Sequence, residues 1–167
     1  KNFCLSILAV YIKSLSSILK DLGVNINTIP VLDVLRRDTN KIIGRRSFSR
    51  DKNIVKALGT HVVKNLNINK IGGVIKHIPG HGSSKLDSHK MRPKVSLTKK
   101  KLNEIDFYPF KLSNSKFAMT AHILYSNIDD QNVATFSKKI IKNVIRKKIG
   151  FKGISISDDI SMKALKY

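Results

Sequence analysis

Short apolar segments alternate with longer amphipathic segments along this chain of 167 residues. The apolar runs at 24–32, 73–75, 117–120 and 153–157 have the length and composition of buried strands. The segments between them carry apolar residues at helical spacing. Mostly apolar strands that alternate with helices favour a parallel sheet covered by helices, so the predicted fold class is α/β.

Four helices are expected between and around these strands. They are 3–22, ended by Gly23; about 51–66, with Asp51 as N-cap; about 98–112, perturbed by Pro109; and 137–150, with Ser137 as N-cap and Gly150 at its end. The resulting four strand–helix units are roughly half of a (β/α)8 TIM-type barrel, which needs about 250 residues. Residues 1–167 are therefore predicted to be one partial barrel domain, with both ends apparently missing.

The charge of the chain is strongly basic, with 32 Lys and Arg against 11 Asp and Glu, a net charge of +21. Such an excess can attract anions, nucleic acid or membrane surfaces. The basic residues are scattered, and no recognition motif for nucleic acid accompanies them, so charge predicts only nonspecific, salt-sensitive binding. A lysine-rich solvated surface is the simpler interpretation, and a basic nucleic-acid-binding protein is the alternative.

The single cysteine, Cys4, excludes an internal disulfide and fits a reducing compartment, so a cytoplasmic location is expected. The apolar start from Phe3 to Ile12 is too short to span a bilayer. It also lacks the basic leader and cleavage site of a signal peptide. No membrane partner is predicted.

One loop concentrates the groups that can do chemistry, and it follows the strand at 73–75. Asp87 and His89 lie two positions apart, so in an extended segment they would point the same way and the carboxylate could orient the imidazole. The alternative is an Asx-turn with a solvent-facing histidine. The loop reads Lys76-His77-Ile78-Pro79-Gly80-His81-Gly82-Ser83-Ser84-Lys85-Leu86-Asp87-Ser88-His89.

A zinc site built from His77, His81 and His89 is another interpretation of this loop. Histidines four apart suit zinc on a helix, but Pro79 and Gly80 interrupt any regular turn there. No metal and no cofactor is predicted.

Two adjacent carboxylates, Asp158 and Asp159, end the last predicted strand. They point in different directions, so at most one faces a central cavity. Asp158 is the candidate nucleophile, because covalent glycoside chemistry uses a carboxylate. Asp159 is the candidate cap of the helix expected to begin near Ser161.

These motifs resemble glycoside hydrolase family 3, specifically its bacterial β-N-acetylglucosaminidases (β-hexosaminidases), which recycle or trim cell-wall muropeptide sugars. The resemblance runs over nearly the whole chain, although an earlier D-x-E-G-G-x-x-x-R segment of the family is absent. The most specific part is K-H-I-P-G-H-G followed by D-S-H. The matching segments are 22–34, 43–48 (I-G-R-R-S-F), 76–82, 87–89, 119–122 and 153–162 (G-I-S-I-S-D-D-I-S-M).

The resemblance implies a retaining β-N-acetylhexosaminidase acting in peptidoglycan recycling, on glycosides that contain N-acetylglucosamine. Asp158 would be the nucleophile, and His89 the general acid/base with Asp87 as its partner. The residues implied to bind the sugar or to form the wall of its site are Arg46, Lys76, His77, Asp33 and His122. Phosphate in place of water as acceptor is a further hypothesis, since a neutral imidazole repels an anion less than a carboxylate would. A truncated, inactive remnant of such an enzyme is the remaining alternative.

Overall fold

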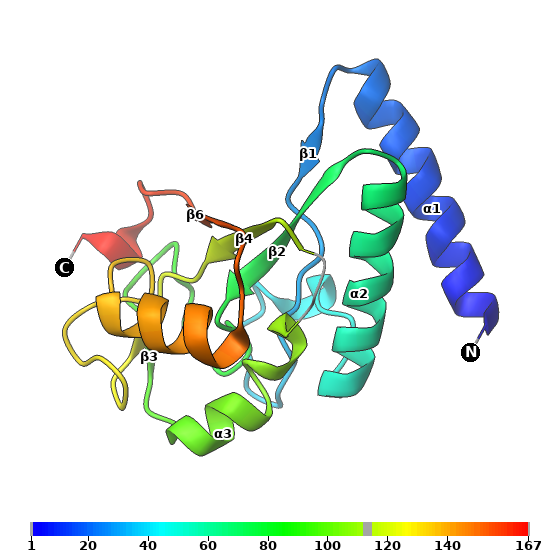
Figure 1. Ribbon diagram of the computed structural model, residues 1–167. Coiled ribbons are helices and arrows are strands. Elements are labelled where there is room, and N and C mark those ends of the chain that lie inside the picture. The colour runs from blue at the N-terminus through cyan, green and yellow to red at the C-terminus, as the bar shows by residue number, and fades with distance from the viewer. Residues whose placement is uncertain (1, 112–114, 167) are drawn as a thin grey trace.

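The computed structural model describes residues 2–111 and 115–166. Four parallel strands form its main sheet in the order β1-β2-β4-β6. They are β1 (Ile26–Asn27), β2 (Gly72–Ile78), β4 (Phe117–Thr120) and β6 (Ile154–Ser157). Figure 1 shows these strands through the middle of the molecule, with α1 and α2 on one side. The predicted α/β class is confirmed, and the parallel order is consistent with part of a TIM-type barrel.

The helices begin close to the residues predicted from the sequence. The longer ones are α1 (Asn2–Asp21), α2 (Lys52–Ile68) and the π-type helix η3 (Ile140–Ile149). Asp51 caps α2 by accepting a hydrogen bond from the Asn53 N–H, as predicted. Ser137 accepts from the Ile140 N–H at 3.0 Å, so it also caps the start of its helix. Gly23 follows α1 with a φ of 73°, a conformation that suits glycine after a helix end.

Two predicted elements differ from the structure. The helix predicted over 98–112 is the short α3 (Lys99–Glu104), followed by a 3-10 turn η2 (Tyr108–Phe110); Leu112 lies outside the described residues. Pro109 sits in that turn, where its missing N–H is tolerated. The expectation of one helix that continues through Pro109 is wrong, because α3 already ends at Glu104. The strand predicted over 24–32 is reduced to β1 and a single bridge between Val31 and Lys76.

Short elements that the sequence did not indicate lie in the loops. Two parallel two-residue strands, β3 (Lys94–Val95) and β5 (Leu124–Tyr125), form a separate small sheet. Two 3-10 turns, η1 (Gly44–Arg46) and η4 (Lys163–Leu165), follow β1 and β6 along the chain. These loop elements matter because η1 and η4 flank the candidate site.

Helix α2 packs closely against the main sheet, at β2. A Cβ atom at Gly59 would meet a methyl of Leu32, so the absence of a side chain there lets the helix approach without displacing that leucine. Val55 and Val63 of the same helix are buried in the main core cluster, with Ile75 of β2. This packing fixes the carboxyl end of β2, from which the chemically rich loop departs.

Apolar surface remains exposed at both sides of the sheet. On α1, Val10 is 66% and Leu22 is 72% exposed, and on β6, the terminal strand of the sheet order, Ile154 is 62% exposed.

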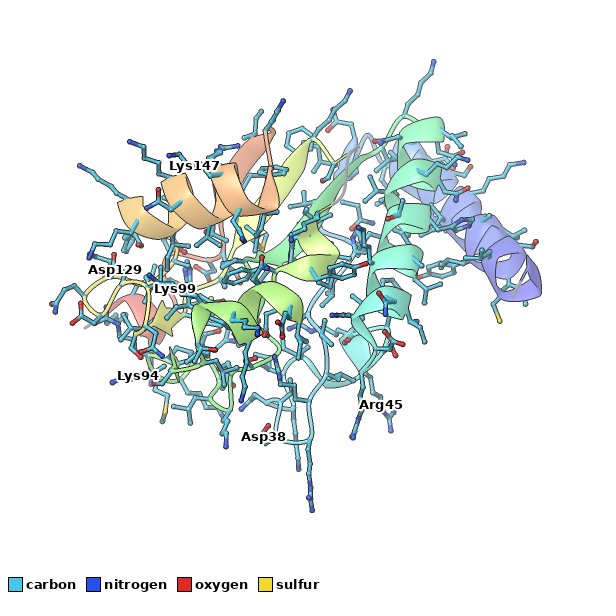
Figure 2. All side chains as sticks on the ribbon, turned by 60° about the horizontal axis from the view of Figure 1, so that its bottom comes forward. Asp38, Arg45, Lys94, Lys99, Asp129 and Lys147 are labelled. Carbon is cyan, nitrogen blue, oxygen red and sulfur yellow. The ribbon has the colours of Figure 1, made fainter. Side chains whose placement is uncertain are left out.

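The basic side chains are distributed over many elements. Figure 2 shows Lys147 on η3, Lys94 on β3 and Arg45 on η1 at different sides of the molecule. This distribution agrees with the scattered pattern in the sequence and differs from a basic arm. No helix within residues 2–111 and 115–166 is long and apolar enough to cross a membrane; the cytoplasmic location stays a prediction.

Candidate active site

A cavity of about 210 Å³ opens where the carboxyl ends of the main strands meet. In parallel α/β proteins, sites lie at this end of the strands. Most of the predicted site residues line it, although they are spread over more than a hundred positions of sequence. The lining residues are Thr28, Ile42, Ile43, Arg46, Lys76, His77, His81, Ser88, His89, Met119 and Asp158.

Asp33 does not line this cavity, but it holds two residues that do, His77 and His81. Its side chain is fully buried, and its Oδ2 lies 2.7 Å from Nδ1 of His77. Its Oδ1 accepts from the backbone N–H groups of His77 (3.3 Å) and His81 (2.6 Å). The carboxylate thus fixes the His77 ring with Nδ1 toward itself and Nε2 toward Asp158, which is 3.8 Å away.

The electrostatics of Asp33 favour the ionised form. Burial tends to raise the pKa of this carboxyl, but the charges and hydrogen bonds of His77 and His81 outweigh it, and the pKa is lowered. The pKa of Lys76 is lowered by its burial and by the nearby Arg46, against the opposing attraction of Asp158 and Asp33. The Lys76 ammonium donates to Oγ1 of Thr28 at 3.2 Å.

Asp87 and His89 form a contact through a turn rather than an extended segment. Oδ1 of Asp87 accepts from the His89 backbone N–H at 2.9 Å and lies 3.0 Å from Nδ1 of the same residue. The expectation of an extended segment is therefore wrong, because the Asx-turn itself brings the two side chains together. Burial tends to raise the pKa of Asp87, and the two hydrogen bonds from His89 lower it overall. The His89 side chain is 54% exposed.

The two carboxylates after β6 separate as the sequence suggested. Asp158 lines the cavity, with its side chain 24% exposed. Asp159 accepts from the Ser161 N–H at 2.8 Å and caps the turn before η4. The helix expected near Ser161 is only the short turn η4.

Arg46 and His122 complete the set of predicted residues, at different depths. Arg46 lies on the surface at the end of η1, with its Nε donating to the Ile42 carbonyl at 2.8 Å, and it lines the cavity. His122 is buried behind the cavity, between Oγ1 of Thr135 (2.7 Å from Nδ1) and the carbonyl of Asp159 (3.1 Å from Nε2). His122 therefore contacts the segment that carries Asp158.

His81 and Ser88 are lining residues that sequence reasoning did not assign to the sugar site. Both are buried, with 3% and 4% exposure, and Nε2 of His81 lies 3.3 Å from Oγ of Ser88. Their positions within the K-H-I-P-G-H-G and D-S-H strings were the available signal. His81 entered the sequence analysis only as a zinc candidate, and among the described residues no three metal-ligating side chains are grouped to hold an ion.

The first part of the loop after β2 is held by close backbone packing. A Cβ atom at Gly82 would lie 2.0 Å from the Val34 carbonyl oxygen, so only glycine fits. The Tyr125 hydroxyl donates to the Gly80 carbonyl at 2.6 Å. Ser83 donates to Oδ1 of Asp106 at 2.7 Å, and Asp106 also pairs with Arg36. Asp106 lies beyond α3 and is buried.

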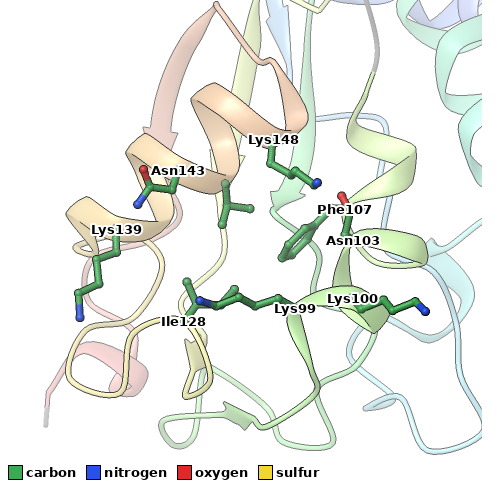
Figure 3. Close-up of a pocket in the computed structure, with 9 residues that line it drawn as sticks. Lys99, Lys100, Asn103, Phe107, Ile128, Lys139, Asn143 and Lys148 are labelled. Carbon is green, nitrogen blue, oxygen red and sulfur yellow. The ribbon is translucent and has the colours of Figure 1, made fainter.

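A second cavity, of about 700 Å³, lies between α3 and η3, as Figure 3 shows. Its walls carry the side chains of Lys99, Lys139 and Lys148 over an apolar floor that includes Phe107. It contains none of the residues predicted for the site, so its greater volume does not make it the candidate active site.

The cavity at the strand ends thus brings imidazoles, cations and an accessible carboxylate together on a parallel α/β scaffold, next to the buried Asp33–His77 pair. Residues 13–167 match the model of the glycosyl hydrolase family 3 N-terminal domain. The chain belongs to this family.

Curated relatives share the family and extend well beyond this chain. The chain is 36% identical over 148 residues to a β-hexosaminidase of Shewanella frigidimarina, covering 86% of this chain and 42% of that protein. It is 33% identical over 162 residues to β-hexosaminidase A of Pseudoalteromonas piscicida, covering 88% of this chain and 27% of that protein. The chain thus spans less than half the length of these relatives.

Solved structures of the same family superpose on nearly the whole chain. A family 3 β-N-acetylglucosaminidase from Paenibacillus sp. matches with a TM-score of 0.91 at 29% identity, covering 97% of this chain and 32% of that one. NagZ from Neisseria gonorrhoeae, solved with N-trifluoroacetyl-D-glucosamine, matches with a TM-score of 0.89 at 30% identity, covering 97% and 48%. The family resemblance read from the sequence is confirmed.

Proposed function

We propose that the protein containing this chain is a retaining β-N-acetylhexosaminidase that removes terminal N-acetylglucosamine from cell-wall muropeptide-type glycosides. The observation that carries the proposal is the shared cavity, which brings Asp158, His89 and the cationic Arg46 and Lys76 together. The β-hexosaminidase names of the relatives support the same substrate class. A role in peptidoglycan recycling is proposed with that substrate, and a cytoplasmic location is proposed from the single cysteine.

In the first step of the proposed mechanism, the Asp158 carboxylate attacks the anomeric carbon and forms a glycosyl ester. The glycosidic carbon–oxygen bond breaks, and the protonated His89 ring gives its Nε2 proton to the leaving oxygen. The Asp87 carboxylate, 3.0 Å from Nδ1, stabilises the positive ring and orients it. In the second step, neutral His89 takes a proton from water, whose oxygen attacks the anomeric carbon and releases Asp158.

The remaining predicted residues would hold the sugar or support the groups that do. Arg46 and Lys76 present donors at the cavity wall, and His77 presents Nε2 beside Asp158. Asp33 and His122 act from behind the cavity, because one fixes His77 and the other contacts the Asp159 backbone. Their role in this proposal is positioning.

The deciding experiment uses the full-length protein and compares Asp158→Asn with Asp159→Asn as matched control. Activity on a chromogenic N-acetyl-β-glucosaminide should fall by about 10³-fold or more in the first variant, which removes the nucleophile. It should stay within about threefold in the second, since asparagine still accepts from the Ser161 N–H. Nuclear magnetic resonance should show the β-anomer as the first product.

A wild type without activity on these glycosides would refute the proposed function and favour the inactive-remnant alternative. Equal losses in the two variants would place the nucleophile elsewhere.

Phosphate is the second acceptor to test, because Arg46 and Lys76 make the cavity wall cationic. In phosphorolysis the phosphate oxygen, not a water oxygen, would attack the glycosyl ester and yield a sugar 1-phosphate. Comparing products with and without phosphate decides the question, and an unchanged rate and product would rule it out.

A further inference from the structure

The loop that carries the proposed acid/base meets the buried centre of the site at one side-chain pair, His81 and Ser88. Residues around this point are exposed: Leu86 is 41% and Met91 is 44% exposed, and the His89 side chain is 54% exposed. Ser88, between Asp87 and His89, is only 4% exposed. Its side chain therefore points inward from a segment that otherwise faces solvent.

His81 is held in place by contacts other than the one with Ser88. Its backbone N–H donates to Oδ1 of Asp33 at 2.6 Å, and its ring packs edge-on against the His77 ring at 5.7 Å between centroids. The hydrogen bonds thus connect Ser88 to His81, His81 to Asp33 and Asp33 to His77. The far end of this chain of contacts is Asp158, 3.8 Å from His77.

The protonation state of His81 determines which group donates in its hydrogen bond with Ser88. Burial lowers the pKa of the His81 ring more than the charge of Asp33 raises it, so the ring is neutral at neutral pH. Nδ1 is buried with no hydrogen-bond partner among the described residues. An unpaired buried N–H costs more than an unused lone pair, so the proton belongs on Nε2, which donates to Oγ of Ser88.

Ser88 is also held through its backbone. Its carbonyl accepts from the Ala164 N–H at 3.1 Å, in the turn η4 that follows Asp158 and Asp159. The serine is therefore tied on one side to the floor of the cavity and on the other to the segment after the proposed nucleophile. A shift of about 1 Å in such a residue is enough to misplace a catalytic group beside it.

We propose that the His81–Ser88 hydrogen bond is a positioning contact that sets the place of the acid/base His89 relative to Asp158. The inference rests on the proposed function. Loss of the bond should weaken proton donation by His89 while leaving attack by Asp158 intact. Its signature is a dependence on the leaving group, because a poor leaving group needs the proton and an activated one does not.

The test measures kcat/KM of the full-length protein on two N-acetyl-β-glucosaminides, one with a dinitrophenyl leaving group and one a β-linked disaccharide. In Ser88→Ala, kcat/KM should fall about tenfold on the disaccharide and stay within about twofold on the dinitrophenyl glycoside. Ser88→Thr keeps the hydroxyl and should restore most of the loss. Ser96→Ala removes an exposed hydroxyl that contacts Ser126, and it should match wild type on both substrates.

A second variant tests the partner. His81→Asn keeps the backbone N–H to Asp33 but is too short to reach Ser88, so it should show the same leaving-group dependence. Combining it with Ser88→Ala should then add little, because both changes remove one interaction.

Equal losses on the two substrates, or no loss on either, would overturn the positioning role while leaving the proposed function standing. A wild type inactive on both substrates would instead refute the proposed function, and this inference with it.

Discussion

The loop after β2 has two halves that differ in how they are held. In residues 79–84, backbone and side chains are fixed by buried partners, including Asp33, Asp106 and the Tyr125 hydroxyl. In residues 85–91, the links include an exposed ion pair between Lys85 and Asp38 and the turn at Asp87. The loop thus has a rigid half, residues 79–84, and an open half, residues 85–91.

This difference matches the two tasks that the proposed chemistry requires. The sugar and the nucleophile need fixed geometry, which buried, hydrogen-bonded groups provide. The acid/base must reach a leaving group that enters and departs, and exposed segments with few buried contacts move most easily. Changes to the buried partners of the first half should therefore affect stability and activity together, whereas changes to the solvent-accessible side chains of the second half should affect activity alone.

In this comparison the largest effect is expected for Asp33→Ala, which removes a buried partner of residues 79–84. The change leaves three buried donors unpaired: the backbone N–H groups of His77 and His81 and the His77 ring. Each such group costs about 1–3 kcal/mol, so the free energy of unfolding should fall by at least about 3 kcal/mol. Activity should fall by about 10²-fold or more, because His77 loses its orientation. Urea unfolding and steady-state kinetics measure the two effects.

Asp38→Ala is the control, since this carboxylate belongs to an exposed ion pair with Lys85. Exposed pairs contribute little, so its urea midpoint should stay close to that of wild type. If Asp33→Ala were as stable as this control, the rigid half would not depend on the buried carboxylate.

A smaller effect, on activity only, is expected for Asp87→Asn in the open half. Asparagine still accepts from the His89 N–H, so the turn is retained, but the charge that supports a protonated ring is lost. The value of kcat/KM on a poor leaving group should fall about 10-fold to 100-fold, with an unchanged urea midpoint. A drop in stability like that of Asp33→Ala would show that the two halves are not distinct.

Local sequence signals predicted much of the fold. The caps at Asp51 and Ser137, the end of α1 at Gly23 and the strand at 117–120 follow from residue types within a few positions. The short strands β3 and β5 could not be predicted in this way, because they form through contacts between segments far apart in sequence, such as Lys94 with Leu124.

Prediction of the candidate site from the sequence is limited in the same way. The resemblance led to the residues that line the cavity, but it could not show that Asp33 and His122 lie behind it or that His81 is fixed by Asp33. At Asp87 the sequence allowed an extended segment or an Asx-turn, and the structure has the turn, with the carboxylate still beside the His89 ring. Burial decides these points, and burial depends on how β2, β4 and β6 bring distant loops together.

The smallest expected effect distinguishes two buried carboxylates that support the rigid half. The pKa of Asp106 is raised, because burial outweighs the nearby Arg36 and the Ser83 hydroxyl, whereas the pKa of Asp33 is lowered. A carboxyl with a raised pKa binds a proton more tightly in the folded state, so its contribution to stability falls as pH rises above its ordinary value of 3.8. Asp33 contributes above that value and loses its contribution as pH falls below it.

Asp106→Asn therefore tests whether burial or the ion pair dominates at this carboxyl. The difference in urea midpoint between wild type and Asp106→Asn should shrink as pH rises from 4 toward neutrality, because the wild type must ionise a buried group that the variant lacks. A difference that grows with pH would mean that attraction by Arg36 exceeds the cost of burial. In that case ionised Asp106 would hold Ser83 in the same way that ionised Asp33 holds His81, and both ends of the rigid half would depend on charge.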